Sequence, residues 1–490
     1  MSRPANHTSG VRANVGWSVL SKGASVIIKL VAVVTLTRSL GTEDFGILIW
    51  VLSTTALLVV FADLGVSGSV ARFIAEEPSF SRQLLRRGAI AAGVSTLVIA
   101  SVLGVFAVPI GGLLGATWLA TIWLLVGAAL AVQVWLRFLT KAYEGLAQQR
   151  VQGRIQLLGG WLPWGLAIAA VALGGGIREV LVGYVVGNTT LAASLSIALW
   201  RLLPPDETGQ APSFRSVLSY AAPLIVTAAS FYVFTSSDIL ILQAFAGSAD
   251  VGVYGAAVRV LDSAQLLSVA VGSGLAVHLV RAARQNHGAE FLQKATQALL
   301  SAYLPAGVAL FFLAPEFVEL AFGDEYAGAA LLLQVYLPYF ILKSVTPTFS
   351  LALDYLGEAG RRAIAIGIAA LANVALNFWL IPRWGAVGAA IATQVTYIPV
   401  GVWYAWRLTR ACGGEWRRWV QSLTPTVVAS TLMGAVLMLL KSTFPVGSMM
   451  ALVVAVPIVC LVYVGVLHLL GGLEPIRQIF RRTTSQRLPA

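Results

Sequence analysis

Two lysines stand inside an apolar stretch that is long enough to cross a lipid bilayer. The stretch runs over residues 15–40, and Lys22 and Lys29 lie within it. In a helix their spacing places both amines on one face, which Ser18 and Ser25 share. A charged amine inside a bilayer is costly unless it reaches the headgroups or a hydrated interior. We expect both lysines to bind an anion in an interior cavity; the alternative is that they snorkel to the membrane surface.

A third basic side chain, Arg259, lies in a later apolar segment and suits bidentate contacts with phosphate. Asp262 follows one helical turn later, so a closed structural ion pair with Arg259 is the competing interpretation. We expect Asp238 to pair with a lysine of the first helix or to bind a coupling cation, with a plain helix-terminus role as the alternative. Asp63 and Lys343 lie nearer the inner face, where we expect hydration or snorkelling. The three aspartates are thus candidate charge partners or ion-coupling residues.

Uncharged polar side chains recur in two apolar segments near the end of the chain, namely Asn373, Asn377, Gln394 and Tyr397. They are candidate sugar contacts, and hydrogen bonds between helices are the equally good alternative. The two cysteines, Cys412 and Cys460, offer neither a disulfide framework nor metal-ligand spacing. No metal or redox site is predicted.

The composition is that of a polytopic membrane protein. The chain has 490 residues, of which 58% are hydrophobic and 11% charged, and its mean hydropathy is +0.82. These values lie outside the range of soluble globular proteins. Apolar windows of about 20 residues give about fourteen candidate helices, so both termini are expected on the same side of the membrane.

The basic residues follow the expected membrane topology. A net charge of +12 in a soluble protein would suggest nucleic acid. Here most of the 33 Lys and Arg residues fall in segments on one side of the candidate helices, and the other side holds only Arg38, Arg178, Arg383 and Lys441. The positive-inside rule makes the basic side, with both termini, cytoplasmic. Nucleic-acid binding is not predicted.

The chain also contains a weak internal repeat at a shift of 206 residues. GTEDFG at 41–46 matches GSADVG at 247–252, and the matched glycines suit a tight turn between two helices. Each copy holds about six helices, so the copies share one orientation, related by an axis along the membrane normal. A polar, proline-rich linker separates them. We therefore expect lobes at 1–205 and 206–410, followed by two further helices and a basic cytoplasmic tail at 411–490.

Five motifs rich in glycine or aspartate occur in order: TRSLGTEDFGIL at 37–48, LGVSGSVARFIAEE at 64–77, AGSADVGVYGAAVRVLD at 246–262, FGDEYAGA at 322–329 and IPRWGAVGAAIAT at 381–393. The ordered set, together with the helix count, resembles the polysaccharide flippase family. These are the Wzx-like O-antigen transporters of the multidrug/oligosaccharidyl-lipid/polysaccharide exporter superfamily.

The resemblance implies an all-α membrane protein with two six-helix lobes around a central cavity, lined in part by helices 1 and 8. It implies that a lipid-linked oligosaccharide of the undecaprenyl pyrophosphate type crosses the bacterial cytoplasmic membrane to the outer leaflet by alternating access. The last two helices would hold the lipid tail. Membrane lipid and polysaccharide polymerase machinery are the implied partners, and no cofactor is implied beyond a coupling ion.

Two other classes of function compete with a flippase. An integral-membrane glycosyltransferase or polymerase on the same lipid carrier would need positioned acids or bases on a larger outer loop. A small-molecule exporter of the multidrug type would need an acidic cavity for cationic drugs, whereas the first helix here carries two lysines and no carboxylate.

Overall fold

The computed structural model describes residues 7–203, 214–443 and 449–474, which form helices joined by short turns. The first helices are α1 His7–Asp63, α2 Val66–Glu76, α3 Ser81–Val105, α4 Ala107–Leu113, α5 Leu119–Gly145, α6 Gln149–Gly159, α7 Leu162–Ala172, α8 Ile177–Leu202 and α9 Phe214–Ala246. The later ones are α10 Ser248–Arg284, α11 Gly288–Phe322, α12 Gly328–Val335, α13 Leu337–Tyr355, α14 Ala359–Ala411, α15 Trp416–Ser422, α16 Thr424–Thr443 and α17 Met449–Leu469. Short 3₁₀ turns cover Pro78–Phe80 and Asp324–Tyr326. Side chains before residue 27 and in parts of α9, α10 and α17 lie outside the description.

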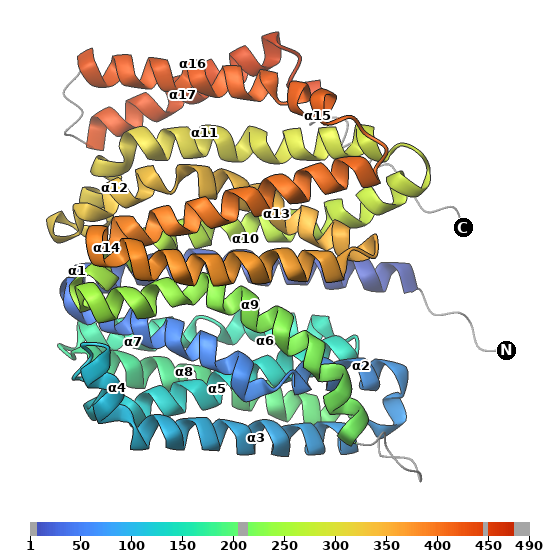
Figure 1. Ribbon diagram of the computed structural model, residues 1–490, viewed down its shortest axis with the longest axis vertical. Coiled ribbons are helices and arrows are strands. Elements are labelled where there is room, and N and C mark those ends of the chain that lie inside the picture. Colours follow the sequence, from blue (N-terminus) through green and yellow to red (C-terminus); the bar gives the residue numbers. More distant parts are fainter. Residues whose placement is uncertain (1–6, 204–213, 444–448, 475–490) are drawn as a thin grey trace. The chain divides into compact units, whose positions relative to one another are not determined.

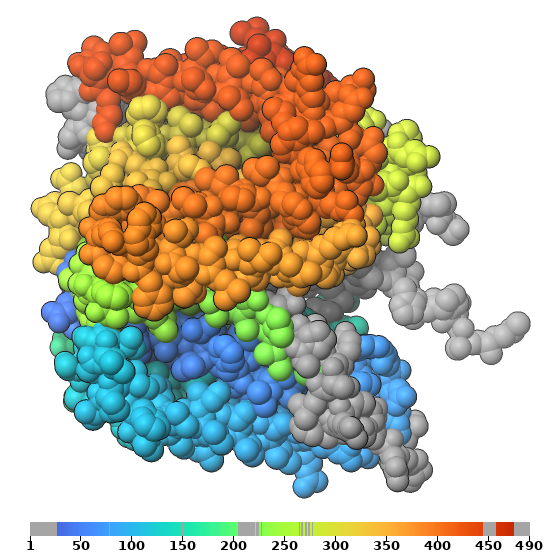
Figure 2. Space-filling model, viewed as in Figure 1, coloured from blue at the N-terminus to red at the C-terminus, as the bar shows by residue number. Residues whose placement is uncertain are grey.

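Within the described ranges, nine helices are long and apolar enough to cross a bilayer, or ten if the bent pair α12 and α13 forms one span. The same ranges contain no strand. The outer face of α3, in blue at the lower edge of Figure 2, carries Val94, Leu97 and Val98, which are 58%, 69% and 55% exposed. Such a row of exposed aliphatic side chains suits contact with lipid rather than water. The all-α membrane fold is confirmed, and the count of fourteen spans stays a prediction.

The chain divides into two compact units. The first unit comprises Met1–Arg259 and Ala370–Ala389, and the second comprises Val260–Ala369 and Ala390–Ala490. The chain passes between the units at three places, once inside α10 and twice inside α14. The lobes expected at 1–205, 206–410 and 411–490 rest on the sequence repeat, and they stay a prediction.

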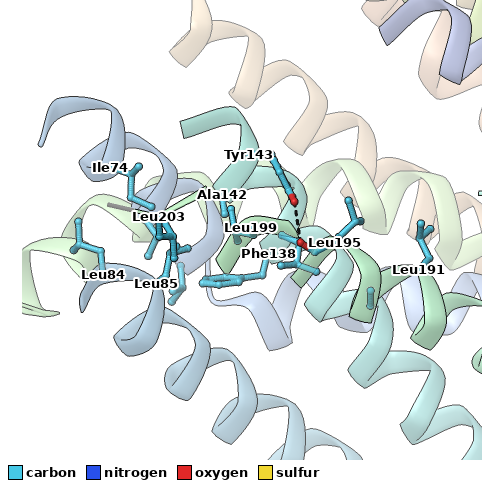
Figure 3. Close-up of a cluster of buried hydrophobic side chains, with 14 residues drawn as sticks. Ile74, Leu84, Leu85, Phe138, Ala142, Tyr143, Leu191, Leu195, Leu199 and Leu203 are labelled. Carbon is cyan, nitrogen blue, oxygen red and sulfur yellow. Dashed lines mark hydrogen bonds between the residues drawn. The ribbon is translucent and has the colours of Figure 1, made fainter. Parts of the chain in front are cut away.

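The first unit has a core between α2, α3, α5 and α8, which lie along one another (Figure 1). Phe138, Leu85 and Leu195 are at most 7% exposed and meet there, as Figure 3 shows. The Tyr143 hydroxyl donates a hydrogen bond to the Leu195 carbonyl oxygen at 2.8 Å, which joins α5 to α8. In a bilayer, close packing and such interhelical hydrogen bonds hold helices together, because the lipid is as apolar as the side chains.

The second unit contains a separate core formed by α11, α16 and α17. Leu313, Met433 and Tyr463 are each at most 7% exposed in it. The Tyr463 hydroxyl donates to the Ser301 carbonyl oxygen at 2.8 Å, and Lys441 forms a 2.7 Å ion pair with Glu316. The two helices at the C-terminal end of the chain are therefore packed against α11.

Glycines mark the breaks in the longest helices. Gly41 interrupts α1 with φ of 71°, and Gly247 precedes α10 with φ of 86°. These two positions correspond under the 206-residue shift, and both need the left-handed backbone that glycine alone adopts readily. The expectation that the matched glycines relieve turn strain is confirmed. Gly385, with φ of 52°, interrupts α14 in the same way.

Candidate functional site

The two lysines expected to bind an anion lie on α1. The side chain of Lys22 lies outside the described residues, so the structure does not test it. Lys29 is exposed, as are its neighbours Ile27 and Val31. Its amine is therefore accessible from outside the packed helices. That accessibility is compatible with an anion-binding role, which stays a prediction.

Arg259 lies on α10 where this helix meets the second half of α1. Its Nη2 is 3.5 Å from the Ser53 hydroxyl oxygen, and the two residues are 206 positions apart. Two more contacts join residues related by the same shift: a Cβ added at Gly255 would lie 2.7 Å from Ile49, and one added at Gly46 would lie 2.9 Å from the Gly252 nitrogen. The two helices thus meet through matching residues, as a twofold axis between two copies would require.

The contact between α1 and α10 is also reciprocal at Gly46 and Gly252: each glycine faces a backbone carbonyl of the other helix. A Cβ at Gly46 would overlap the carbonyl oxygen of Ser248, and a Cβ at Gly252 would overlap that of Thr42. Thr42 and Ser248 are themselves related by 206 residues. Glycine permits this close backbone approach, as small residues commonly do between membrane helices. Arg259 therefore lies about two turns along α10 from Gly252, at the far end of a tight, symmetric helix contact.

Asp238 on α9 is buried at 6% exposure and bonds to α10. The Tyr254 hydroxyl donates to its Oδ2, and the backbone N–H of Ile239 donates to its Oδ1 at 2.8 Å. Tyr254 is itself fully buried. Asp238 thus has a hydrogen-bond partner that the sequence did not reveal, while its pairing with a lysine of α1 and its role in ion coupling stay predictions.

Asp262 forms an ion pair with Lys343 of α13, and the Nζ–Oδ1 distance is 2.8 Å. The Lys343 side chain is only 9% exposed, and its Nζ lies 4.6 Å from the centre of the Tyr339 ring. The expectation that Lys343 snorkels or is hydrated was wrong, because the partly exposed Asp262 carboxylate and an aromatic face stabilise the buried ammonium in place.

Asp63, at the end of α1, is 1% exposed and is likewise held by protein groups. The hydroxyl and the backbone N–H of Ser67 both donate to its Oδ1, and Arg137 Nε lies 3.5 Å from its Oδ2. Arg137 also reaches the Tyr232 hydroxyl at 3.5 Å. Hydration of Asp63 was therefore the wrong expectation, because Ser67 and Arg137 of α5 contact its carboxylate.

The four candidate sugar contacts are bonded to protein groups. Asn377 Nδ2 donates to Asn373 Oδ1 at 2.9 Å, and both residues are fully buried. Gln394 Nε2 donates to the Val335 carbonyl oxygen at 2.6 Å, and the Tyr397 hydroxyl lies 2.7 Å from the Thr346 hydroxyl. Among the described atoms, Asn377 Oδ1 and Gln394 Oε1 have no hydrogen-bond partner. Bonding between protein groups accounts for much of this polarity, and contact with sugars stays a prediction.

Comparison with known proteins supplies the class of the molecule. A family model described as polysaccharide biosynthesis protein matches residues 11–272. A probable low-salt glycan biosynthesis flippase of Haloferax volcanii is 28% identical over 452 residues, covering 90% of this chain and 91% of the relative. The succinoglycan biosynthesis transport protein ExoT of Rhizobium meliloti is 23% identical over 460 residues, covering 90% and 88%.

A solved structure shows the same fold. The lipid II flippase MurJ in an inward closed conformation superposes with a TM-score of 0.74 at 17% sequence identity, covering 92% of this chain and 97% of that one. The resemblance to polysaccharide flippases drawn from the five motifs is thereby confirmed.

Proposed function

Since the chain belongs to the polysaccharide biosynthesis protein family, we propose that it is a flippase that carries a lipid-linked oligosaccharide across the cytoplasmic membrane. It is a transporter rather than an enzyme. Both curated relatives carry names of glycan biosynthesis transport, and each is matched over nine tenths of this chain.

The cargo is proposed to be anionic, with a pyrophosphate of the undecaprenyl type between lipid and glycan. The observation that carries this is Arg259, a guanidinium on α10 at the contact between matching residues of α1 and α10. A phosphate can accept two parallel hydrogen bonds from one guanidinium, and a site between two halves can open to either side in turn. We also propose Lys22 and Lys29 of α1 as residues that bind the anionic headgroup.

The direct test is accumulation of the cargo when the protein is depleted. Extraction of lipid-linked intermediates should then yield a complete repeat unit on the inner leaflet, whereas loss of a glycosyltransferase would leave a truncated glycan. Accumulation of truncated glycans, or no accumulation, would reject the proposal.

The anion site is tested by charge reversal in the depleted strain. We expect Arg259→Glu and Lys29→Glu to insert normally but to lose export, because a carboxylate repels the pyrophosphate. Arg178→Glu is the matched control, since Arg178 is exposed in the first turn of α8. Wild-type export by both reversed variants would reject the proposed anion site. The proposal that the protein is a flippase would still be decided by the depletion experiment.

A further inference from the structure

A cavity of about 420 Å³ lies in the first unit, between α3, α5 and α8. Its size falls within the range of about 300–1,000 Å³ common for small-molecule sites. It is separate from the contact of α1 with α10 that holds Arg259. The lining residues come from these three helices and from the residue after α8: Arg82, Gln83, Leu85, Arg86, Ala89, Trp135, Phe138, Leu139, Ser196, Leu199, Trp200 and Leu203.

The floor of the cavity is apolar and rigidly packed. Leu85, Phe138 and Leu199, seen together in Figure 3, belong to the buried core of this unit. The Trp135 ring stacks on Phe138 with centres 5.4 Å apart, and its Nε1 donates to the Ser196 hydroxyl at 2.9 Å. With the polar atom of Trp135 satisfied by protein, the floor offers hydrocarbon surface and suits an aliphatic chain.

The rim of the cavity is basic. Arg82 and Arg86 lie one turn apart on α3, and the twelve lining residues include no Asp or Glu. Arg82 donates from Nη2 to the Leu203 carbonyl oxygen at 3.0 Å and lies over the Trp200 ring, while its Nε has no acceptor among the described atoms. Arg86 is exposed. The rim can therefore donate hydrogen bonds to a negatively charged group at the mouth.

The cavity lies at one end of its helices. Its α3 residues are in the first turns after Ser81, and its α8 residues are in the last turns before the helix ends at Leu202. Trp200 at the mouth is 66% exposed, as is usual for a tryptophan at the level of lipid headgroups. This end carries the arginines that the positive-inside rule assigns to the cytoplasm. Basic pockets between membrane helices at that level suit anionic headgroups.

We propose that this cavity binds an anionic phospholipid of the inner leaflet, with its phosphate on Arg86 and Arg82 and part of one acyl chain on the floor formed by Phe138 and Leu199. The bound lipid would hold α3 against α8 at the membrane surface. The site serves a structural lipid and is independent of the transported cargo.

The test is lipid retention by the full-length purified protein, measured by native mass spectrometry after equilibration with phosphatidylglycerol or phosphatidylcholine. We expect the wild type to retain phosphatidylglycerol preferentially. Arg86→Gln should lower its retention about fivefold, the effect of one basic residue at an anionic lipid surface. Ala89→Leu, which fills the cavity and keeps both arginines, should lower retention of the same lipid.

Arg87→Gln is the matched control, since Arg87 is the next residue on α3, is exposed and does not line the cavity. Equal losses of phosphatidylglycerol retention in Arg86→Gln and Arg87→Gln would mean that surface charge attracts the lipid without a specific site, and this result would overturn the proposal. Unchanged retention in Ala89→Leu would show that no chain enters the cavity, and equal retention of both lipids would mean that it lacks headgroup selectivity. Either outcome would also reject the site.

Discussion

At the scale of single residues, the charges inside the helices are placed in pairs. Lys343 and Asp262 join α13 to α10, and Arg137 and Asp63 join α5 to α1. The sequence showed each of these residues in or beside an apolar segment. It could not show the partners, because they lie 81 and 74 positions apart along the chain and meet only once the helices pack. The sequence identified Arg259 as a candidate site residue in an apolar segment, but only the folded structure shows its contact with Ser53.

We predict that the Lys343 and Asp262 pair is stabilising. Lys343→Met or Asp262→Asn should each lower the free energy of unfolding by about 1–3 kcal/mol, less than for a fully buried pair because the Asp262 side chain is 36% exposed. The double variant should lose less than the sum of the two, as thermal unfolding in detergent would measure. Glu76→Gln breaks the exposed Arg72 pair and is the control. Strictly additive losses would contradict an interaction between the two side chains.

A second residue-scale prediction concerns pH. Hydrogen bonds from Arg407, and then from Arg361, hold the pKa of Glu358 below its ordinary value of 4.5. A lowered folded-state pKa means that this stabilisation is fully present above pH 4.5 and is lost as the pH falls through the folded pKa. The Tm difference between wild type and Glu358→Gln should therefore be constant near neutrality and shrink below pH 4.5.

Glu415→Gln supplies the comparison, because Glu415 pairs with Arg418 while both side chains are about two thirds exposed. Its Tm difference from the wild type should be small at every pH. A Glu358→Gln difference that grows in acid would contradict the assignment.

At the scale of helices, glycines and hydropathy were the two sequence signals that predicted most about where helices lie and where they break. The breaks at Gly41 and before α10 follow from the repeated turn motif. The bend of 51° between α12 and α13 was not among the features predicted from the sequence. Pro338 in the first turn of α13 supplies its cause: it lacks a backbone N–H and cannot continue the preceding helix. A proline within an apolar run is compatible with a bent or a straight span, so the packing of the neighbouring helices decides whether the span bends.

We predict that the contact of α1 with α10 tolerates no side chain at its glycines. Gly46→Ala and Gly252→Ala should each lower Tm and reduce glycan export, because the added methyl groups overlap the carbonyl oxygens of Ser248 and Thr42. Gly93→Ala and Gly360→Ala are controls in helices where nothing lies within 4 Å of the new methyl. At these two control positions, alanine should leave the stability of the protein unchanged from the wild type or raise it slightly. Unchanged stability in both contact variants would show that the helices stand further apart.

At the scale of the whole molecule, composition predicted a polytopic membrane protein, and apolar windows predicted that helices span the bilayer. Hydropathy carries that signal because every backbone polar group in a bilayer must bond within its own helix. The division into two compact units was not predictable from the sequence, since its boundaries after Arg259, Ala369 and Ala389 fall inside α10 and α14 rather than in a linker between helices.

Topology provides the prediction at this scale. Reporters fused within 80–86 and within 144–150 should read as cytoplasmic, because these segments carry Arg82, Arg86 and Arg150, which the positive-inside rule retains there. Activity of a periplasmic reporter at either place would invalidate the helix count. A fusion near Arg178, on the opposite side, should give the reverse reading and serves as the control.

The meeting of Ser53 with Arg259 bears on ancestry. In a homodimer, any residue beside the axis faces its own duplicate, so an arginine there would confront a second arginine and repel it. Once two copies are fused into one gene, they can diverge: one keeps a small hydroxyl and the other acquires the guanidinium. Duplication thereby permits an asymmetry that self-association forbids, because the two residues that meet at the contact no longer need to be identical.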